Sequence, residues 1–208
     1  MQDKKIDLGK EIIKTGGKVA GIPGVELIIM FVQHFLDKHL KKRFAKFISD
    51  AEVDMEMIDK ILKNETYSNC FYAILETVRQ THSKLGVVAL ALIYKDHWND
   101  ESYLIAAIRS FSQISDKVIE AFIILYESIP NEKNYLNLRN HKDKVGYFHE
   151  LYNEAVELIS RNFFVTSTGA CMQANAPVQG MKWEHTDSYY QYCKAARNLI
   201  YTYNSKDT

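Results

Sequence analysis

The sequence of 208 residues is poor in residues that break helices, with only three prolines and nine glycines. Proline removes a backbone donor and glycine weakens a helix by about 1 kcal/mol, so their scarcity favours long uninterrupted elements. Hydrophobic residues make up 47% and charged residues 25% of the chain, which is ordinary for a globular protein and excludes a disordered one. The composition therefore predicts a mostly helical globular protein.

Cysteine is also scarce, because Cys70, Cys171 and Cys193 are widely spaced and form no CxxC pair. This spacing argues against a zinc knuckle and against a disulfide framework, both of which need cysteines in closer or paired arrangement. The N-terminal residues lack the apolar stretch and cleavage site of a signal peptide. Reduced thiols and the lack of an export signal predict a cytoplasmic protein, either free or peripheral to the inner membrane.

The chain has no excess of either charge, since 26 lysines and arginines balance 26 aspartates and glutamates. No global attraction draws it to nucleic acid or anionic lipid, so such binding has to come from a local patch. No HExxH, GxSxG, P-loop or GxGxxG motif occurs, and His34 and His39 would diverge on a helix. We therefore expect no enzyme, no metal and no cofactor, and a hydrolase of unrecognised motif is the weakest alternative.

Hydrophobic periodicity predicts a series of amphipathic helices. We expect the first to begin just after Pro23 and run to residue 48 as one helix. Its buried face would include Leu27, Phe31, Phe35 and Leu36. Further helices are expected over residues 54–63, from 66 or 68 to about 80, from about 84 to 94, over 101–129, and from about 147 to 159.

The segment 101–129 has the most regular pattern in the chain. Apolar residues recur at steps of three and four from Leu104 through Phe111 to Leu125, which predicts one continuous core helix of about 40 Å. The polar stretch that follows Pro130 is predicted to be a loop.

The C-terminal region has a different texture from the rest of the chain. Two short strands are expected near 163–167 and 181–185, joined by a long loop, with Trp183 packed inward. A final helix would begin at Thr186 or Asp187. The predicted fold is therefore an all-α multi-helix bundle with one short C-terminal β-hairpin and a winged-helix-like end. We expect a short helix and glycine-rich linker over residues 1–20, a helical bundle over 21–160, and the hairpin with the last helix over 161–208.

A basic cluster follows the apolar run that begins at Val25. The run is about twelve residues long, too short to span a bilayer. It could begin a core helix with a solvated basic end, or lie in a membrane interface with its cations near anionic headgroups. We expect the cations to form an interaction surface: Lys38, Lys41, Lys42, Arg43 and Lys46.

The winged-helix outline also permits a DNA-binding regulator as the alternative function. The nucleic-acid contacts would be Arg161, Lys182, Lys194 and Arg197. Glu184 and Asp187 oppose them, and phosphate contacts supply most of the affinity of such modules. A contact with another protein is therefore favoured over DNA.

The order of features resembles the helical proteins of bacterial abortive-infection and phage-defence loci, the Abi-alpha-like group. The segments that resemble this group are "GGKVAGIPGVELI", "KKRFAKF", "VRQTHSKLGVVALAL" and "KWEHTDSYYQYCK". The resemblance implies a non-catalytic protein of phage defence or immunity that contacts another protein or the membrane surface. A homo-oligomer is compatible with that role.

Overall fold

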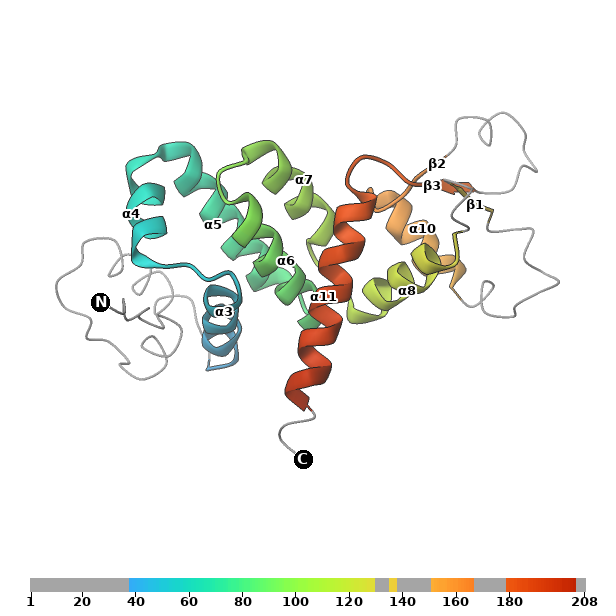
Figure 1. Cartoon of the computed structure of the whole chain (residues 1–208), viewed down its shortest axis with the longest axis horizontal. Helices are drawn as coiled ribbons and strands as arrows, with labels where there is room; N and C mark the ends of the chain where they lie inside the picture. The colour runs from blue at the N-terminus through green and yellow to red at the C-terminus, as the bar shows by residue number, and fades with distance from the viewer. Residues whose placement is uncertain (1–37, 130–134, 138–150, 167–178, 205–208) are drawn as a thin grey trace, which may run out of the picture. The chain divides into compact units, whose positions relative to one another are not determined.

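The computed structural model describes residues 38–129, 135–137, 151–166 and 179–204, and all structural statements below concern these ranges (Figure 1). They fold mainly into helices with one small antiparallel sheet, so the predicted all-α class with a C-terminal hairpin is confirmed. The elements are α3 (Lys38–Asp50), α4 (Met55–Lys63), α5 (Glu65–Gln80), α6 (Lys84–His97), α7 (Glu101–Phe111), α8 (Asp116–Glu127), β1 (Tyr135–Asn137), α10 (Tyr152–Ser160), β2 (Val165–Thr166), β3 (Gln179–Met181) and α11 (Thr186–Asn204).

The chain divides into two compact units, each built from two stretches of sequence. Unit 1 comprises residues 1–81 and 87–113, and unit 2 comprises residues 82–86 and 114–208. This division differs from the expected boundaries after residues 20 and 160. The reason lies in α8 and α10, which pack with each other and, through α8, with α11. The last helix and the hairpin therefore share a core with helices that the sequence pattern assigned to the main bundle.

Unit 1 is organised around α5 and α6. The ring of Tyr94 on α6 lies 5.9 Å from that of Phe47 on α3 and 5.6 Å from that of Phe71 on α5, measured between centroids. All three side chains are buried. The apolar spacing of the α5 sequence places Phe71, Ile74, Leu75 and Val78 on one face, and each is at most 1% exposed. The predicted break after α5 is confirmed, and α6 is buried along most of its length.

Side-chain caps begin three helices of unit 1. Asp54 accepts a hydrogen bond from the Met57 N–H at 2.8 Å, and Asp100 accepts one from the Tyr103 N–H at 3.0 Å. Asn64 caps α5 in the same way. Helix α5 therefore starts slightly earlier than the expected Thr66 or Ser68. The Asn64 side chain can accept a hydrogen bond from a free N–H group of the first turn as well as a threonine or serine side chain can.

The expected continuous helix over 101–129 is wrong, since it is two helices, α7 and α8. Gln113 adopts a left-handed backbone with φ of 55°, and Ser115 caps α8 by accepting a hydrogen bond from the N–H three residues on. The Thr81 hydroxyl donates to the Phe111 carbonyl at 3.2 Å, which satisfies one of the groups freed at the end of α7. A serine cap therefore overrides the hydrophobic periodicity here, and the boundary between the units falls at this link.

Helix α3 is the described part of the helix expected over residues 21–48. Phe44, Phe47 and Ile48 are buried as the pattern predicts, and the helix ends at Asp50. The start after Pro23 and the buried positions before Lys38, namely Leu27, Phe31, Phe35 and Leu36, lie outside the described residues.

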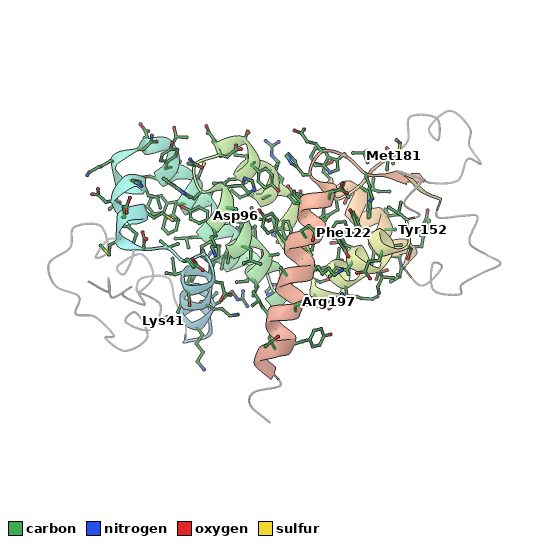
Figure 2. All side chains as sticks on the ribbon, in the orientation of Figure 1. Lys41, Asp96, Phe122, Tyr152, Met181 and Arg197 are labelled. Carbon is green, nitrogen blue, oxygen red and sulfur yellow. The ribbon has the colours of Figure 1, made fainter. Side chains whose placement is uncertain are left out.

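Unit 2 has an aromatic core beneath its sheet. The Phe122 ring of α8 meets the rings of Phe163 and Phe164 edge-on, at 4.8 Å and 5.3 Å between centroids. Phe163 in turn contacts Tyr189 of α11. Figure 2 shows Phe122 between α8 and α11. These contacts join α8, the residues before β2, and α11 into one core.

The sheet of unit 2 has the strand order β1-β3-β2, and both pairings are antiparallel. The β2–β3 hairpin is confirmed but shorter than expected, because Phe163 and Phe164 turn into the core and Trp183 already leads into α11. Strand β1 lies in the stretch expected to be a loop. Trp183 is half-buried and meets the His185 ring edge-on, so it is only partly directed inward.

A polar joint in unit 2 connects the start of α6 with the start of α8. The Asp116 carboxylate accepts hydrogen bonds from the Ser83 hydroxyl at 2.5 Å and the Leu85 N–H at 2.9 Å. The Ser83 hydroxyl also accepts from the Gly86 N–H at 2.6 Å. A Cβ added at Gly86 would lie 3.0 Å from Cγ2 of Ile114 and from the Ser83 hydroxyl, so a larger residue fits only if one of these side chains shifts.

Candidate interaction surface

Helix α3 exposes two of the four cations whose side chains the structure describes. Lys41 and Lys42 are exposed, and neither forms an ion pair with a carboxylate of the described residues. Figure 2 shows Lys41 pointing away from the other helices of unit 1. The backbone of Lys38 belongs to α3, but its side chain lies outside the described part. Lys41 and Lys42 therefore form the available basic face of α3.

Arg43 has a different role from its two neighbours. Its Nη1 donates to the Thr81 carbonyl at 2.6 Å and lies 3.5 Å from the Val78 carbonyl. Both carbonyls belong to the C-terminal end of α5, where the helix leaves acceptors unsatisfied and favours positive charge. Arg43 thus fastens α3 to α5, and it is only partly exposed.

Lys46 is also engaged within the helix, because its Nζ lies 2.9 Å from a carboxylate oxygen of Asp50. Of the five cations predicted to form an interaction surface, the structure therefore leaves Lys41 and Lys42 uncompensated. Sequence spacing alone could not separate them from Arg43, since the partners of Arg43 lie 35 and 38 residues away.

The apolar side of α3 is occupied by the core of unit 1. Phe44 is 3%, Phe47 0% and Ile48 6% exposed. A helix that binds a membrane interface needs its apolar face free to enter the lipid. The apolar face of α3 is instead packed in the core of unit 1. Among the described helices, none combines the length and the apolar character that crossing a bilayer would demand.

Four other described cations of unit 1 have carboxylate partners. The pairs are Lys60–Glu56 at 2.7 Å, Lys63–Asp59 at 2.6 Å, Arg79–Glu76 at 2.5 Å and Lys95–Glu52 at 2.7 Å. Arg109 on α7 is exposed and has no ion pair within the described ranges. Among the side chains of unit 1 that the structure describes, the lysines and arginines without an ion pair or hydrogen bond are therefore Lys41, Lys42 and Arg109.

The four cations proposed for DNA contact all have acidic partners in unit 2. Arg161 pairs with Glu157 at 2.7 Å and Lys182 lies 3.6 Å from Asp187. The remaining pairs are Lys194–Glu127 at 3.4 Å, Arg197–Glu120 at 3.6 Å and Arg197–Glu127 at 3.9 Å. The structure brings Lys182, Lys194 and Arg197 to the contact of α8 with α11, where their charge is balanced. Arg161 lies apart from them, just after α10.

Two stacked tyrosines lie at the centre of this charged contact, and sequence analysis did not identify them. The rings of Tyr126 and Tyr190 are 3.9 Å apart and nearly parallel. Tyr126 donates to Asp187 at 2.7 Å, and Tyr190 donates to Glu127 at 2.8 Å. Lys182 lies 4.0 Å above the Tyr126 ring, which is within the range of a cation–π contact. The only sequence signal is the spacing of Tyr190 and Lys194, one helical turn apart.

The network shifts the pKa of its members in the directions expected for a mutually stabilised cluster. Burial, and then the hydrogen bond to Asp187, raise the pKa of Tyr126. The hydrogen bond from Tyr190 lowers the pKa of Glu127, and contact with Tyr190 raises that of Lys194. The shifts of Glu127 and Lys194 therefore favour the charged forms of these two groups where α8 meets α11.

The described cysteines are poorly suited to nucleophilic chemistry. Cys70 and Cys193 are buried, and burial raises the pKa of both thiols. The thiol form that burial favours is the weaker nucleophile. Cys171 lies outside the described residues. Within the described ranges, no three His, Cys, Asp or Glu side chains are grouped so that they could hold a metal ion.

Comparison with models of known protein families, with curated proteins and with solved structures finds no match to this chain. The fold and the surface define a two-unit, mostly α-helical protein with a small basic face on α3.

Proposed function

We propose that this protein acts by contact with an acidic protein surface, through Lys41 and Lys42 of α3, and not by catalysis. The supporting observation is that these adjacent ammonium groups are exposed on a helix whose other face is anchored in the core. The anchor is Arg43 on the α5 carbonyls together with buried Phe47. A rigid helix that presents uncompensated charge suits a partner of opposite charge, because little order has to be gained on binding.

A membrane surface is the less favoured partner for this face. Each basic residue near an anionic leaflet contributes about 1 kcal/mol, so Lys41 and Lys42 together contribute about 2 kcal/mol. Stable membrane attachment needs a second contribution from inserted apolar groups, and the apolar side chains of α3 are buried in unit 1. A protein partner can add contacts of its own around the two lysines.

DNA binding through the C-terminal region is the second candidate, and it has weaker support. Phosphates would have to displace the carboxylates that already pair with Lys182, Lys194 and Arg197. Affinity for duplex DNA depends on phosphate contacts that release counterions, and cations held by internal acids gain little from the exchange.

The cellular role that we propose is phage defence or immunity in the bacterial cytoplasm, and it follows from the resemblance of the sequence segments alone. Under this proposal, protection depends on the contact between the α3 face and its acidic partner. The activity would then depend on the charge of Lys41 and Lys42 more than on any single cysteine or histidine.

The test compares bacterial survival under phage challenge, or under a cognate toxin, for the native protein and two double variants. Lys41→Gln with Lys42→Gln should lose most of the protection, because it removes the uncompensated charge of α3. Lys84→Gln with Arg109→Gln is the matched control, since it neutralises two exposed cations elsewhere and should keep protection. Circular dichroism and a thermal unfolding curve confirm that both variants fold.

Full protection by the Lys41–Lys42 variant, combined with loss of protection in a single cysteine or histidine variant, would contradict the proposal and favour an enzyme. Tight sequence-specific DNA binding that is lost on changing Lys182 and Arg197 would favour the regulator instead.

A further inference from the structure

Unit 1 has two exposed carboxylates that match the uncompensated lysines of α3. Glu65 is the first residue of α5 and Glu101 is the first residue of α7. Both are exposed, and neither pairs with a cation of the described residues. Acidic residues in the first turn are favoured by the helix dipole, but the dipole leaves their carboxylates accessible to an external cation.

The two carboxylates lie at the same end of unit 1. The rings of Tyr67 and Trp98 meet edge-on with centroids 5.2 Å apart. Glu65 is two residues before Tyr67, and Glu101 is three residues after Trp98. Both rings are partly exposed. Carboxylates beside accessible aromatic rings form an environment that attracts an ammonium group, through ion pairing and cation–π contact.

The basic face lies at the opposite end of α5. Arg43 contacts the carbonyls of Val78 and Thr81, at and just after the end of this helix, and Lys41 and Lys42 directly precede Arg43. Helix α5 has 16 residues and is therefore about 24 Å long. A lysine side chain of about 6 Å does not cover that distance, so the lysines and the Glu65–Glu101 end cannot pair within one copy of the unit.

We propose that a second copy of this chain binds the α3 face, with Lys41 and Lys42 of one molecule against the Glu65–Glu101 end of the next. This inference rests on the proposed function of the α3 face as a contact for an acidic partner. The two surfaces differ, so the contact is head-to-tail and leaves a free surface at each end of an assembly. Two exposed ammonium groups give weak association, because each exposed ion pair contributes little.

Sedimentation velocity of the full chain tests this contact over a range of concentrations up to about 1 mM. At low ionic strength the weight-average mass should rise above the 24.1 kDa of one chain without levelling off at a dimer. It should return to one chain at about 1 M salt, where the Debye length is about 3 Å.

Charge reversal identifies the two surfaces. Lys41→Glu with Lys42→Glu should remain a single chain at every concentration, and so should Glu65→Lys with Glu101→Lys. An equimolar mixture of the two double variants should associate again, because each reversed surface meets one of opposite charge. Lys84→Glu with Arg109→Glu is the control for the Lys41–Lys42 variant, since both replace two cations by glutamates. The control should associate as the native chain does.

A single-chain mass at all concentrations overturns the self-association, as does a mixture of the two reversed variants that fails to associate. Loss of association in the Lys84–Arg109 control overturns it too, because the effect would then follow net charge. If the native chain stays monomeric and the Lys41–Lys42 variant still loses protection against phage, only the identity of the partner is wrong. If protection is also unaffected, the proposed function fails with it.

Discussion

Replacement of Tyr94 by phenylalanine is expected to stabilise the protein. Tyr94 has no exposed surface, and its ring lies between Phe47 and Phe71 in the core of unit 1. Its hydroxyl oxygen is buried and has no hydrogen-bond partner among the described residues. Burial, with a smaller contribution from Cys70, raises the pKa of this phenol, as expected for a hydroxyl that no charged donor or acceptor stabilises.

The magnitude follows from the cost of burying a hydroxyl without a partner. That cost is about 1–3 kcal/mol from mutational data on proteins. Tyr94→Phe removes the oxygen and keeps both ring contacts. The empty volume left by one oxygen atom offsets part of the gain, since core cavities are destabilising. We therefore expect a net stabilisation of about 1 kcal/mol, which corresponds to a rise in melting temperature of about 2–4 °C for a chain of this size.

The assay is urea unfolding followed by circular dichroism, together with thermal unfolding of the same samples. Tyr190→Phe is the matched control, because it removes the same hydroxyl from a tyrosine that donates to Glu127 at 2.8 Å. That variant should lose about 1 kcal/mol, the net value of a hydrogen bond to a partly exposed charged group. Removal of the hydroxyl should thus stabilise the protein at Tyr94 and destabilise it at Tyr190.

A loss of 1 kcal/mol or more in Tyr94→Phe would refute the reasoning, since it would mean that the Tyr94 hydroxyl has a partner such as a buried water. Equal effects of the two deletions would show that the presence or absence of a hydrogen-bond partner does not determine the sign of the stability change.

Three further changes test the packing of unit 2. Gly86→Ala should destabilise the protein by about 1–3 kcal/mol in urea unfolding, because its Cβ would lie 3.0 Å from Ile114; a stabilised variant would mean that helix propensity outweighs this clash. Asp116→Ala should cost about 1–3 kcal/mol, because a buried serine hydroxyl and a backbone N–H lose their acceptor; an unchanged midpoint would contradict that role. The hydrogen bond from Lys117 lowers the pKa of Glu154, so its contribution is complete above the usual carboxyl pKa and is lost as pH falls through the lowered value. The stability difference between native and Glu154→Gln protein should therefore shrink on acidification, and a difference that grows would be opposite to this sign.

Local chemistry accounts for the parts of the fold that the sequence predicts well. The inward face of α5 follows from apolar spacing, and the break after α5 follows from Thr81 to Ser83. The prediction of one continuous helix over 101–129 is wrong because one helix and two successive helices can show the same spacing of apolar residues. Ser115 lies on the same face as the apolar residues before and after it, and a serine is also a good N-cap. The left-handed backbone at Gln113 ends the first helix, so Ser115 acts as the cap of α8.

The sequence also does not show which charged side chains are paired on the surface. Composition shows that positive and negative charges balance overall, but it does not show which cations have partners. Arg43 and Lys41 are two residues apart in a basic cluster, yet one is fastened to α5 and the other is exposed. Likewise, Lys182, Lys194 and Arg197 resemble a nucleic-acid patch until Glu127 and Asp187 are placed beside them.

The sequence by itself determined the helical class, most helix positions, the C-terminal hairpin and many of the buried residues, such as those of α5, because these depend on spacing and propensity within a few turns. Only the tertiary structure decided the two-unit division, the third strand, the stacking of Tyr126 on Tyr190 and the availability of Lys41 and Lys42. Those features depend on pairs such as Arg43 with Thr81 or Tyr126 with Asp187, which are 38 and 61 residues apart. Groups that far apart in the chain form hydrogen bonds only when folding brings them within a few ångströms, and no local pattern records that distance.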